Sequence, residues 1–298
     1  MRLILRGDAD SLACAVFVTT METIESIKFA HPKDMQDGII EVTDKDIICN
    51  LPFHPNCYMW FDHHISEEER DEKVKAGDFK GKFGLAPSAA RLVYEYYNDP
   101  ALKKYEEFLE AVDKYDSARL TMEDVANPKG WILLFSSLDP RTSIGDYKNY
   151  FFELVDWVKR LSLKEIMKKP EAALRCEYVI SELEKFKDAM LKYTRFDGNV
   201  IITDFRELDE IPMGSRFYVY KLFPEGNISL RISMGKDRKK VVCAAAYNIF
   251  KRDSKTNIGM LFAKYGGGGH TGAATCQLDF ETADETIEEI IEQLKADG

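Results

Sequence analysis

Four short apolar runs in the N-terminal third of the chain alternate with segments of helical character. Each run is too short to be a buried helix and is bounded by turn residues, which is typical of buried strands. Strands that alternate with helices favour a parallel sheet joined by crossover helices. The runs cover residues 2–5, 27–31, 46–50 and 57–61. We therefore predict an α/β fold with a mainly parallel sheet over residues 1–160.

The character of the chain changes in its last third. Helical periodicity predicts helices over residues 12–18, 86–97 and 105–118, and a mostly helical stretch over 147–193 with a break at Pro170. After Asn199, apolar runs are separated by turn residues, as in hairpins. These runs, at 200–203, 216–220, 228–232 and 241–245, precede predicted helices at 258–265 and 282–295. We expect a helical connector over 161–194 and a smaller α/β domain over 195–298, with the active site in the cleft between the domains.

Polar side chains follow three of the N-terminal strands at the points where those strands end. They are Asp8 and Asp10, Asn50, and the triplet Asp62-His63-His64. A buried strand that ends in carboxylates and imidazoles needs polar partners or a metal ion there. Such ligands suit manganese, iron, zinc or magnesium. A solvated turn could also explain the triplet, and N-capping by Asp10 could explain one aspartate of the first pair, but not both.

One predicted helix, over residues 105–118, places a carboxylate on its inward face. Asp116 lies on the apolar stripe of this helix, and Asp113 borders the same stripe. A core-facing carboxylate usually has a partner. A salt bridge to Lys114 or Arg119 is the alternative, although neighbouring side chains point away from the stripe. Either Asp113 or Asp116 is therefore a candidate metal ligand.

Four consecutive glycines, Gly266 to Gly269, stand directly before His270. Glycines allow a backbone to approach another group closely, and successive N–H groups can form a nest for an anion. A helix C-terminus is the simpler alternative, but one glycine would be enough for it. We therefore predict an anion-binding loop.

Composition limits the classes of ligand and the cellular setting. The 298 residues carry a formal net charge of −10, which argues against a duplex-DNA surface, so attraction of an anion must be local. Six cysteines without a CxxC pattern fit reduced thiols, and we expect a cytoplasmic protein. The N-terminus does not have the pattern of a signal peptide. Since no apolar run approaches the roughly 18 residues of a spanning helix, we expect no membrane partner.

Clustered carboxylates and imidazoles with a nearby anion nest suggest two-metal hydrolysis of a phosphoester. The ordered set resembles the DHH phosphoesterase superfamily, in the branch with a DHH-associated C-terminal domain, over nearly the whole chain. The resemblance rests on Gly7-Asp8-Ala9-Asp10, Asp62-His63-His64, Asp116 and the stretch Gly266-Gly267-Gly268-Gly269-His270. Exopolyphosphatase-related proteins look most similar. The wider superfamily includes pyrophosphatases, nanoRNases, cyclic-dinucleotide phosphodiesterases and single-strand exonucleases.

This resemblance implies roles for individual residues. Two manganese ions are expected, with magnesium as the alternative metal. Asp8 would hold one ion, and the other would bind Asp10, His63 and Asp116. Asp62 and His64 would support the ions and the scissile phosphate. The rest of the substrate would be bound by Gly267, Gly268, Gly269, His270 and Arg231.

Three positions depart from the family pattern. Arg6 stands where many relatives have histidine, Asn50 where many have aspartate, and Ser11 where glycine is common. The first two changes remove ligands from one metal site. We expect this site to be weak, filled only with substrate, or lost, with Arg6 acting as a fixed cation toward the phosphate.

Two functions of different classes follow. The first is a metal-dependent phosphoesterase acting on a small anionic substrate: a short single-stranded oligonucleotide, a cyclic dinucleotide, a nucleotide or the end of a polyphosphate. The second is a sensor that binds a nucleotide or polyphosphate without cleaving it. An exonuclease for long single strands is disfavoured by the net charge and by the absence of an aromatic and basic tract. A homodimer is compatible with the sequence.

Overall fold

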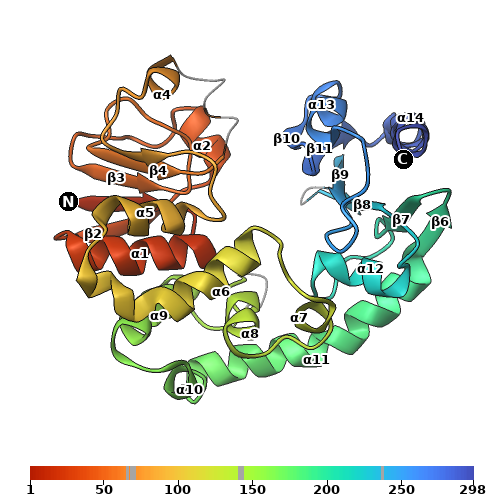
Figure 1. The fold of residues 1–298 in the computed structure, drawn as a ribbon. Coiled ribbons are helices and arrows are strands. Elements are labelled where there is room, and N and C mark those ends of the chain that lie inside the picture. The colour runs from red at the N-terminus through yellow and green to blue at the C-terminus, as the bar shows by residue number, and fades with distance from the viewer. Residues whose placement is uncertain (65–66, 68–71, 140–143, 236–237) are drawn as a thin grey trace. The chain divides into compact units, whose positions relative to one another are not determined.

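The computed structural model describes residues 1–64, 67, 72–139, 144–235 and 238–298. The chain divides into two compact units, each built around its own sheet (Figure 1). Unit 1 consists of residues 1–119 and 128–178, and unit 2 of residues 120–127 and 179–298. Residues 65–69, whose sequence is typical of a helix start, lie outside the described residues apart from Glu67.

Unit 1 contains a five-stranded parallel sheet in the order β2-β1-β3-β4-β5. The prediction of a parallel sheet is therefore confirmed, and β5 adds a strand that was not predicted. The elements of unit 1 are β1 (Arg2–Leu5), α1 (Ala9–Met21), β2 (Ser26–Phe29), α2 (Pro32–Gln36), β3 (Asp46–Cys49), β4 (Met59–Asp62), α4 (Glu72–Ala76), β5 (Gly81–Phe83), α5 (Ala89–Tyr97), η1 (Pro100–Tyr105), α6 (Glu106–Asp116), α8 (Gly130–Ser136), α9 (Tyr147–Arg160), α10 (Leu163–Ile166) and the first part of α11 (Pro170–Tyr193).

The topology of this sheet brings the predicted site residues to one edge. Strands β1, β3 and β4 are parallel neighbours, so their carboxyl ends lie at the same edge of the sheet. The segments that follow them begin at Arg6, Asn50 and His63. In open parallel sheets, ligands bind outside the carboxyl ends of the strands. The edge that carries these segments is therefore where a site is expected.

The central strands β1, β3 and β4 are buried on both faces, which explains why they are apolar without alternation. Helix α1 is buried along most of its length, from Ala9 to Val18. On one side of the sheet, Trp60 packs against Phe53, Phe79 and Phe83, and its indole N–H donates to the carbonyl of Leu51 at 2.9 Å. This packing fixes β4 directly before the Asp-His-His triplet.

Unit 2 contains a six-stranded mixed sheet in the order β10-β11-β9-β8-β7-β6, in which β7 and β8 are the parallel pair. The prediction of a second α/β unit is confirmed. Its elements are α7 (Met122–Ala126), the last part of α11, β6 (Thr194–Asp197), β7 (Val200–Asp204), η3 (Arg216–Tyr218), α12 (Val219–Leu222), β8 (Ile228–Met234), β9 (Lys240–Tyr247), α13 (Ile258–Ala263), β10 (Gly268–His270), β11 (Ala273–Asp279) and α14 (Ala283–Ala296).

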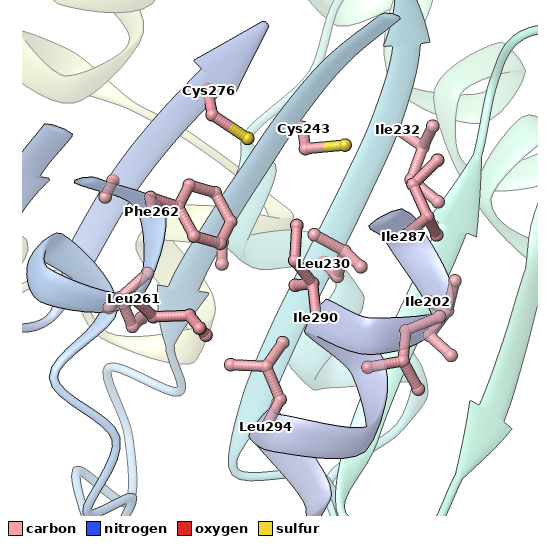
Figure 2. Packing of buried hydrophobic residues seen from close by; sticks show 14 of the residues in the cluster. Ile202, Leu230, Ile232, Cys243, Leu261, Phe262, Cys276, Ile287, Ile290 and Leu294 are labelled. Atoms are coloured by element: carbon pink, nitrogen blue, oxygen red, sulfur yellow. The ribbon is translucent and has the colours of Figure 1, made fainter. Parts of the chain in front are cut away.

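The core of unit 2 lies between one face of the sheet and the helices α13 and α14 (Figure 2). Strands β8 and β9 alternate buried and partly exposed residues, as expected for a sheet covered on one face. Ile287, Ile290 and Leu294 of α14 are buried at helical spacing against this face. The other face carries the partly exposed residues of the strands.

One prediction of secondary structure in unit 2 is wrong. Residues 216–220 were expected to form a strand because they are aromatic and β-branched, but they form η3 and the start of α12. The Ser215 side chain accepts a hydrogen bond from the Phe217 N–H and starts this helical turn, and Phe217 is buried. Tertiary burial therefore outweighs local propensity there. The helix expected over 258–265 is present as α13 and ends two residues earlier, at Ala263, before strand β10.

None of the helices in the described part of the chain is long and apolar enough to cross a membrane.

Candidate metal centre and substrate-binding face

The turn after β1 places two aspartates at the start of α1. Gly7 has a φ of +94°, which favours glycine, and its carbonyl accepts a hydrogen bond from the Tyr147 hydroxyl. Asp8 is the N-cap of α1 and accepts a hydrogen bond from the Ser11 N–H at 2.9 Å. N-capping by Asp10, which the sequence left open as an alternative, is therefore wrong. Asp10, in the first turn, is available for another role.

Asp10 is completely buried, and its carboxylate is held by the start of a second helix. It accepts hydrogen bonds from the N–H groups of Ala89 and Ala90, the first residues of α5, at 2.9 and 2.8 Å. Burial raises the pKa of the Asp10 carboxyl to about 6, while the nearby His63 acts in the opposite direction and Asp8 adds to the rise. Because both hydrogen bonds come from a rigid helix terminus, the carboxylate has a fixed position at the edge of the sheet.

His63 directs one ring nitrogen at two carboxylates. Its Nε2 lies 3.9 Å from Oδ2 of Asp10 and 3.3 Å from Oδ2 of Asp116 at the end of α6. Its Nδ1 lies 3.1 Å from the carbonyl oxygen of Ala86. Since a carbonyl can only accept, Nδ1 carries the proton, and in the neutral ring Nε2 presents a lone pair to the carboxylates. This orientation of a histidine by a backbone carbonyl is the usual arrangement at a metal ligand.

The three side chains together fit a divalent cation. Asp10, His63 and Asp116 form the one group of its kind among the described residues, with all ligand atoms within 4.8 Å of one another. Two carboxylate oxygens and one imidazole nitrogen suit manganese, iron, zinc or magnesium. A cation would also relieve the repulsion between the carboxylates and the Nε2 lone pair. The structure thus brings together three of the predicted metal ligands, from α1, the end of β4 and α6.

His64 forms a second pair at the same strand end. Its Nδ1 lies 2.7 Å from the carboxylate of Asp62, which is 1% exposed. Burial lowers the pKa of His64, but the hydrogen bond and the charge of Asp62 outweigh it, so the pKa is raised. The positive charge of Arg6 opposes this rise. Asp62 therefore favours an imidazolium at His64.

Asp8 and Asn50 lie together, as predicted, but in an arrangement dominated by hydrogen-bond donors. The Asn50 Nδ2 lies 3.1 and 3.3 Å from the two carboxylate oxygens of Asp8. Arg6 Nε lies 3.7 Å from Asp8 Oδ2. Asn50 has a φ of +55°, and its side chain is turned toward α1 from the end of β3. These contacts hold the Asp8 carboxylate without a metal.

Asp113, the other candidate on α6, has a different set of partners. Its buried carboxylate accepts hydrogen bonds from the Ser88 hydroxyl at 2.6 Å and from Nε of Arg91 at 2.9 Å, and it forms an ion pair with that arginine. Neither of the alternatives considered from the sequence, Lys114 or Arg119, is its partner in these contacts. Of the two aspartates, Asp116 is the one that lies beside His63.

The glycine run is used partly by the fold itself. The N–H groups of Gly266 and Gly267 donate to the carbonyls of Ala263 and Phe262 and thereby end α13. The prediction that all four glycine N–H groups face an anion is therefore wrong for these two. A Cβ at Gly267 would overlap the carbonyl of Thr275, and one at Gly269 would overlap the backbone of β11. Gly268 alone has open space beside it and a φ that any residue can adopt.

Arg231 and Gly268 share one cross-strand row of the second sheet. Arg231 on β8 pairs with Ala244 on β9, which pairs with Thr275 on β11, which pairs with Gly268 on β10. Directly paired residues point to the same face of a sheet. Since Arg231 and Ala244 are on the partly exposed face, the row lies on the face opposite the core. Along this row, the small residues Ala244 and Thr275 stand between Arg231 and strand β10, which carries Gly268 and His270.

Several groups that build this site were not found from the sequence. The N–H groups of Ala89 and Ala90 and the carbonyl of Ala86 contribute through the backbone, so their side chains give no signal. Ser88 is the N-cap of α5, and its position just after a proline is a recognisable helix start. Tyr147 comes from a helix far along the chain, and no local pattern connects it with Gly7.

Comparisons with known structures identify proteins of similar fold. The pGpG-specific phosphodiesterase PggH from Vibrio cholerae is 38% identical, with 100% of this chain and 99% of that chain covered and a TM-score of 0.80. The DHH domain of a protein described as a member of a ribosomal-protein family is 14% identical (99% and 86% covered, TM-score 0.60). An exopolyphosphatase-related protein from Bacteroides fragilis is 13% identical (99% and 92% covered, TM-score 0.51). No protein-family model and no curated protein matches the chain.

The two more distant structures share the fold alone, which is that of the DHH proteins. The similarity to PggH extends over the whole length of both chains at an identity that establishes common ancestry. The chain belongs to the DHH superfamily of phosphoesterases. The resemblance predicted from the ordered motifs is confirmed.

Proposed function

We propose that the protein is a divalent-cation-dependent phosphodiesterase that hydrolyses a short, linear phosphodiester such as the dinucleotide pGpG. The observation that carries this proposal is the group formed by Asp10, His63 and Asp116, which fits one divalent cation. The full-length similarity to a pGpG-specific phosphodiesterase supports the class of substrate. The net charge of −10 is in keeping with a small substrate rather than a nucleic-acid duplex.

Asp10, His63 and Asp116 would hold the cation. We propose manganese, with magnesium as the alternative, because both accept carboxylate oxygens and manganese also accepts imidazole readily. When bound, the ion supplies Lewis acidity and neutralises charge on the phosphoryl oxygens. The protein holds the metal ligands in position. The α5 terminus holds Asp10, and the Ala86 carbonyl holds the ring of His63.

Proton transfer is the role that we propose for the pair of Asp62 and His64. Asp62 accepts a hydrogen bond from the Nδ1–H and stabilises the imidazolium, so Nε2 can donate a proton to the oxygen that leaves the phosphorus as a water molecule attacks it. Arg6, whose side chain is about half exposed, would contact a phosphoryl oxygen. His64 would then act on the leaving oxygen and Arg6 on a phosphoryl oxygen of the same phosphodiester.

For unit 2 we propose a face of its own that binds a phosphate and its nucleoside. Arg231 and the segment around Gly268 present a basic group and open backbone on one face, next to His270. A guanidinium and a side-chain-free strand are suited to a terminal phosphate and its nucleoside. Contacts to a chain end would favour short substrates over the interior of a polymer.

A binding protein without hydrolytic activity is the second candidate. It is favoured by one specific observation: Arg6 and Asn50 surround Asp8 with hydrogen-bond donors where many relatives have metal ligands. Such a protein would bind the same short phosphodiester and leave it intact. The presence of all three proposed metal ligands, Asp10, His63 and Asp116, favours hydrolysis.

The test is hydrolysis of pGpG by the purified protein with manganese or magnesium, followed by chromatography of the nucleotides. We expect release of GMP that requires the metal and that is lost when EDTA is added or in Asp10→Asn. A cyclic dinucleotide, a longer oligonucleotide and polyphosphate serve as comparison substrates. Tight binding of pGpG without any GMP would favour the sensor, and neither binding nor cleavage of any of these compounds would refute the proposal.

A further inference from the structure

Asp8 is surrounded by groups that donate hydrogen bonds. Its Oδ1 accepts from the Ser11 N–H at 2.9 Å and from Asn50 Nδ2 at 3.1 Å, and its Oδ2 lies 3.3 Å from the same amide nitrogen. Arg6 Nε approaches Oδ2 at 3.7 Å. Both carboxylate oxygens therefore accept from donors, and Oδ2 also forms an ion pair with a permanent cation.

The orientation of the Asn50 amide reinforces this arrangement. Its Nδ2 faces Asp8, so its Oδ1 is turned away; this oxygen is buried and has no hydrogen-bond partner among the described residues. A buried acceptor without a donor is costly, so the contact of Nδ2 with the Asp8 carboxylate determines the orientation of the amide. An amide NH₂ group cannot be a metal ligand, and an arginine close by repels a cation.

The positions at which the sequence departs from the family pattern meet around this one carboxylate. Arg6 forms the ion pair, Asn50 donates from β3, and Ser11 donates its N–H to Asp8. The Ser11 hydroxyl also accepts the Arg6 backbone N–H at 3.2 Å. These three residues form one network with Asp8, which we call the Asp8 network.

The other group of acidic residues has the opposite character. Asp10 and Asp116 face an imidazole nitrogen that carries a lone pair, and the Nδ1 of His63 is already bound to a carbonyl. Three ligand atoms converge there, whereas the Asp8 network offers donors. Asp10, His63 and Asp116 thus fit a cation, and the Asp8 network does not.

We infer that this protein binds a single divalent cation, at Asp10, His63 and Asp116, and that the Arg6 guanidinium, held by the Asp8 network, takes the place of the second one. The inference rests on the proposed function for the presence of the first cation and of a substrate phosphate. Arg6 then supplies one positive charge to that phosphate, and this charge cannot dissociate as a metal ion can. Hydrolysis would depend on one bound metal ion rather than two.

Metal stoichiometry tests the inference directly. Isothermal titration of the metal-free protein with manganese, checked by counting free Mn²⁺ by electron paramagnetic resonance, should give one equivalent. The double variant Arg6→His, Asn50→Asp replaces the donors by ligands and should bind a second equivalent. The matched control Arg6→Lys keeps the charge and should remain at one. Circular dichroism and thermal unfolding of each variant show that it is folded.

Each outcome separates this inference from the proposed function. Two equivalents in the parent protein would overturn the inference and leave the proposed function standing. No binding at millimolar manganese would overturn the proposed function, and the inference with it. A folded double variant that still binds one equivalent would show that Arg6 and Asn50 do not exclude the second cation.

The role of Arg6 has its own test. Arg6→Gln should leave the manganese equivalent unchanged and lower kcat/KM for pGpG by about 100-fold, the usual effect of removing one charge-stabilising donor. Arg6→Lys should recover part of this loss, because it restores the charge but not the geometry of the guanidinium. Loss of the first manganese equivalent in Arg6→Gln, or an unchanged kcat/KM, would contradict the role assigned to the guanidinium.

Discussion

Two aspartates on α6, three residues apart, should respond to substitution in opposite ways. Asp113 accepts hydrogen bonds from the Ser88 hydroxyl and the Arg91 guanidinium, and its side chain is 5% exposed. Asp116 is 27% exposed and lies beside His63. We expect Asp113→Ala to destabilise the fold and keep the metal, and Asp116→Ala to lose the metal and keep the fold.

The magnitude follows from the partners that each substitution leaves behind. Hydrogen bonds to a charged group contribute about 1.5–3 kcal/mol each, and breaking a buried ion pair costs about 3–5 kcal/mol. Arg91 is 26% exposed and can be rehydrated, so we reduce the expected loss for Asp113→Ala to about 2–4 kcal/mol. Asp116→Ala removes one of two carboxylates that repel each other, so its effect on the metal-free protein should be within about 0.5 kcal/mol.

Urea unfolding in the presence of EDTA measures the first effect, and titration with manganese measures the second. With a slope of about 2 kcal/mol/M, the unfolding midpoint of Asp113→Ala should fall by about 1–2 M. Manganese affinity should fall by about 10-fold or more in Asp116→Ala alone. If Asp113→Ala lost the metal while its unfolding midpoint stayed unchanged, Asp113 would be the ligand and the reasoning from its ion pair would be refuted.

Four further predictions concern the metal ligands and the glycine strand. His63→Ala should lower manganese affinity by about 10-fold or more, because it removes the ligand that Ala86 orients; unchanged metal content after dialysis would contradict this. Gly268→Ala should keep the thermal stability and weaken pGpG binding, whereas Gly267→Ala should lower the Tm because its Cβ would overlap the backbone of β11; equal effects of the two on stability would argue against this distinction. Manganese affinity should rise with pH as the pH passes through about 6, because the Asp10 carboxyl, whose pKa burial raises to about 6, must lose its proton to bind; calorimetry that shows no rise below this pH would exclude that cause. In the metal-free protein the same raised pKa should make stability fall as the pH rises from 3.8 to about 6, since the folded state holds this proton more tightly.

The architecture of unit 1 and the family could be predicted from the sequence because the signals are local. Short apolar runs, each followed by polar residues, define strands whose carboxyl ends carry ligands, whatever the details of packing. The parallel sheet and the second α/β unit were predicted in this way, and the DHH superfamily was predicted from the resemblance of the ordered motifs. The strand expected at residues 216–220 was wrong, because its aromatic residues are buried by a helical turn that Ser215 starts.

The chemical state of each site residue was decided by the tertiary structure. Sequence spacing left Asp113 and Asp116 as alternatives, and the difference between them comes from Arg91, which is 22 residues away. Likewise, Asp10 receives its hydrogen bonds from residues 79 and 80 positions further along the chain. Patterns along the chain show which side chains can bind a metal or a phosphate. Whether such a side chain faces a hydrogen-bond donor or a lone pair depends on groups that only the folded chain brings together. Many of these are backbone groups, which have no sequence signal.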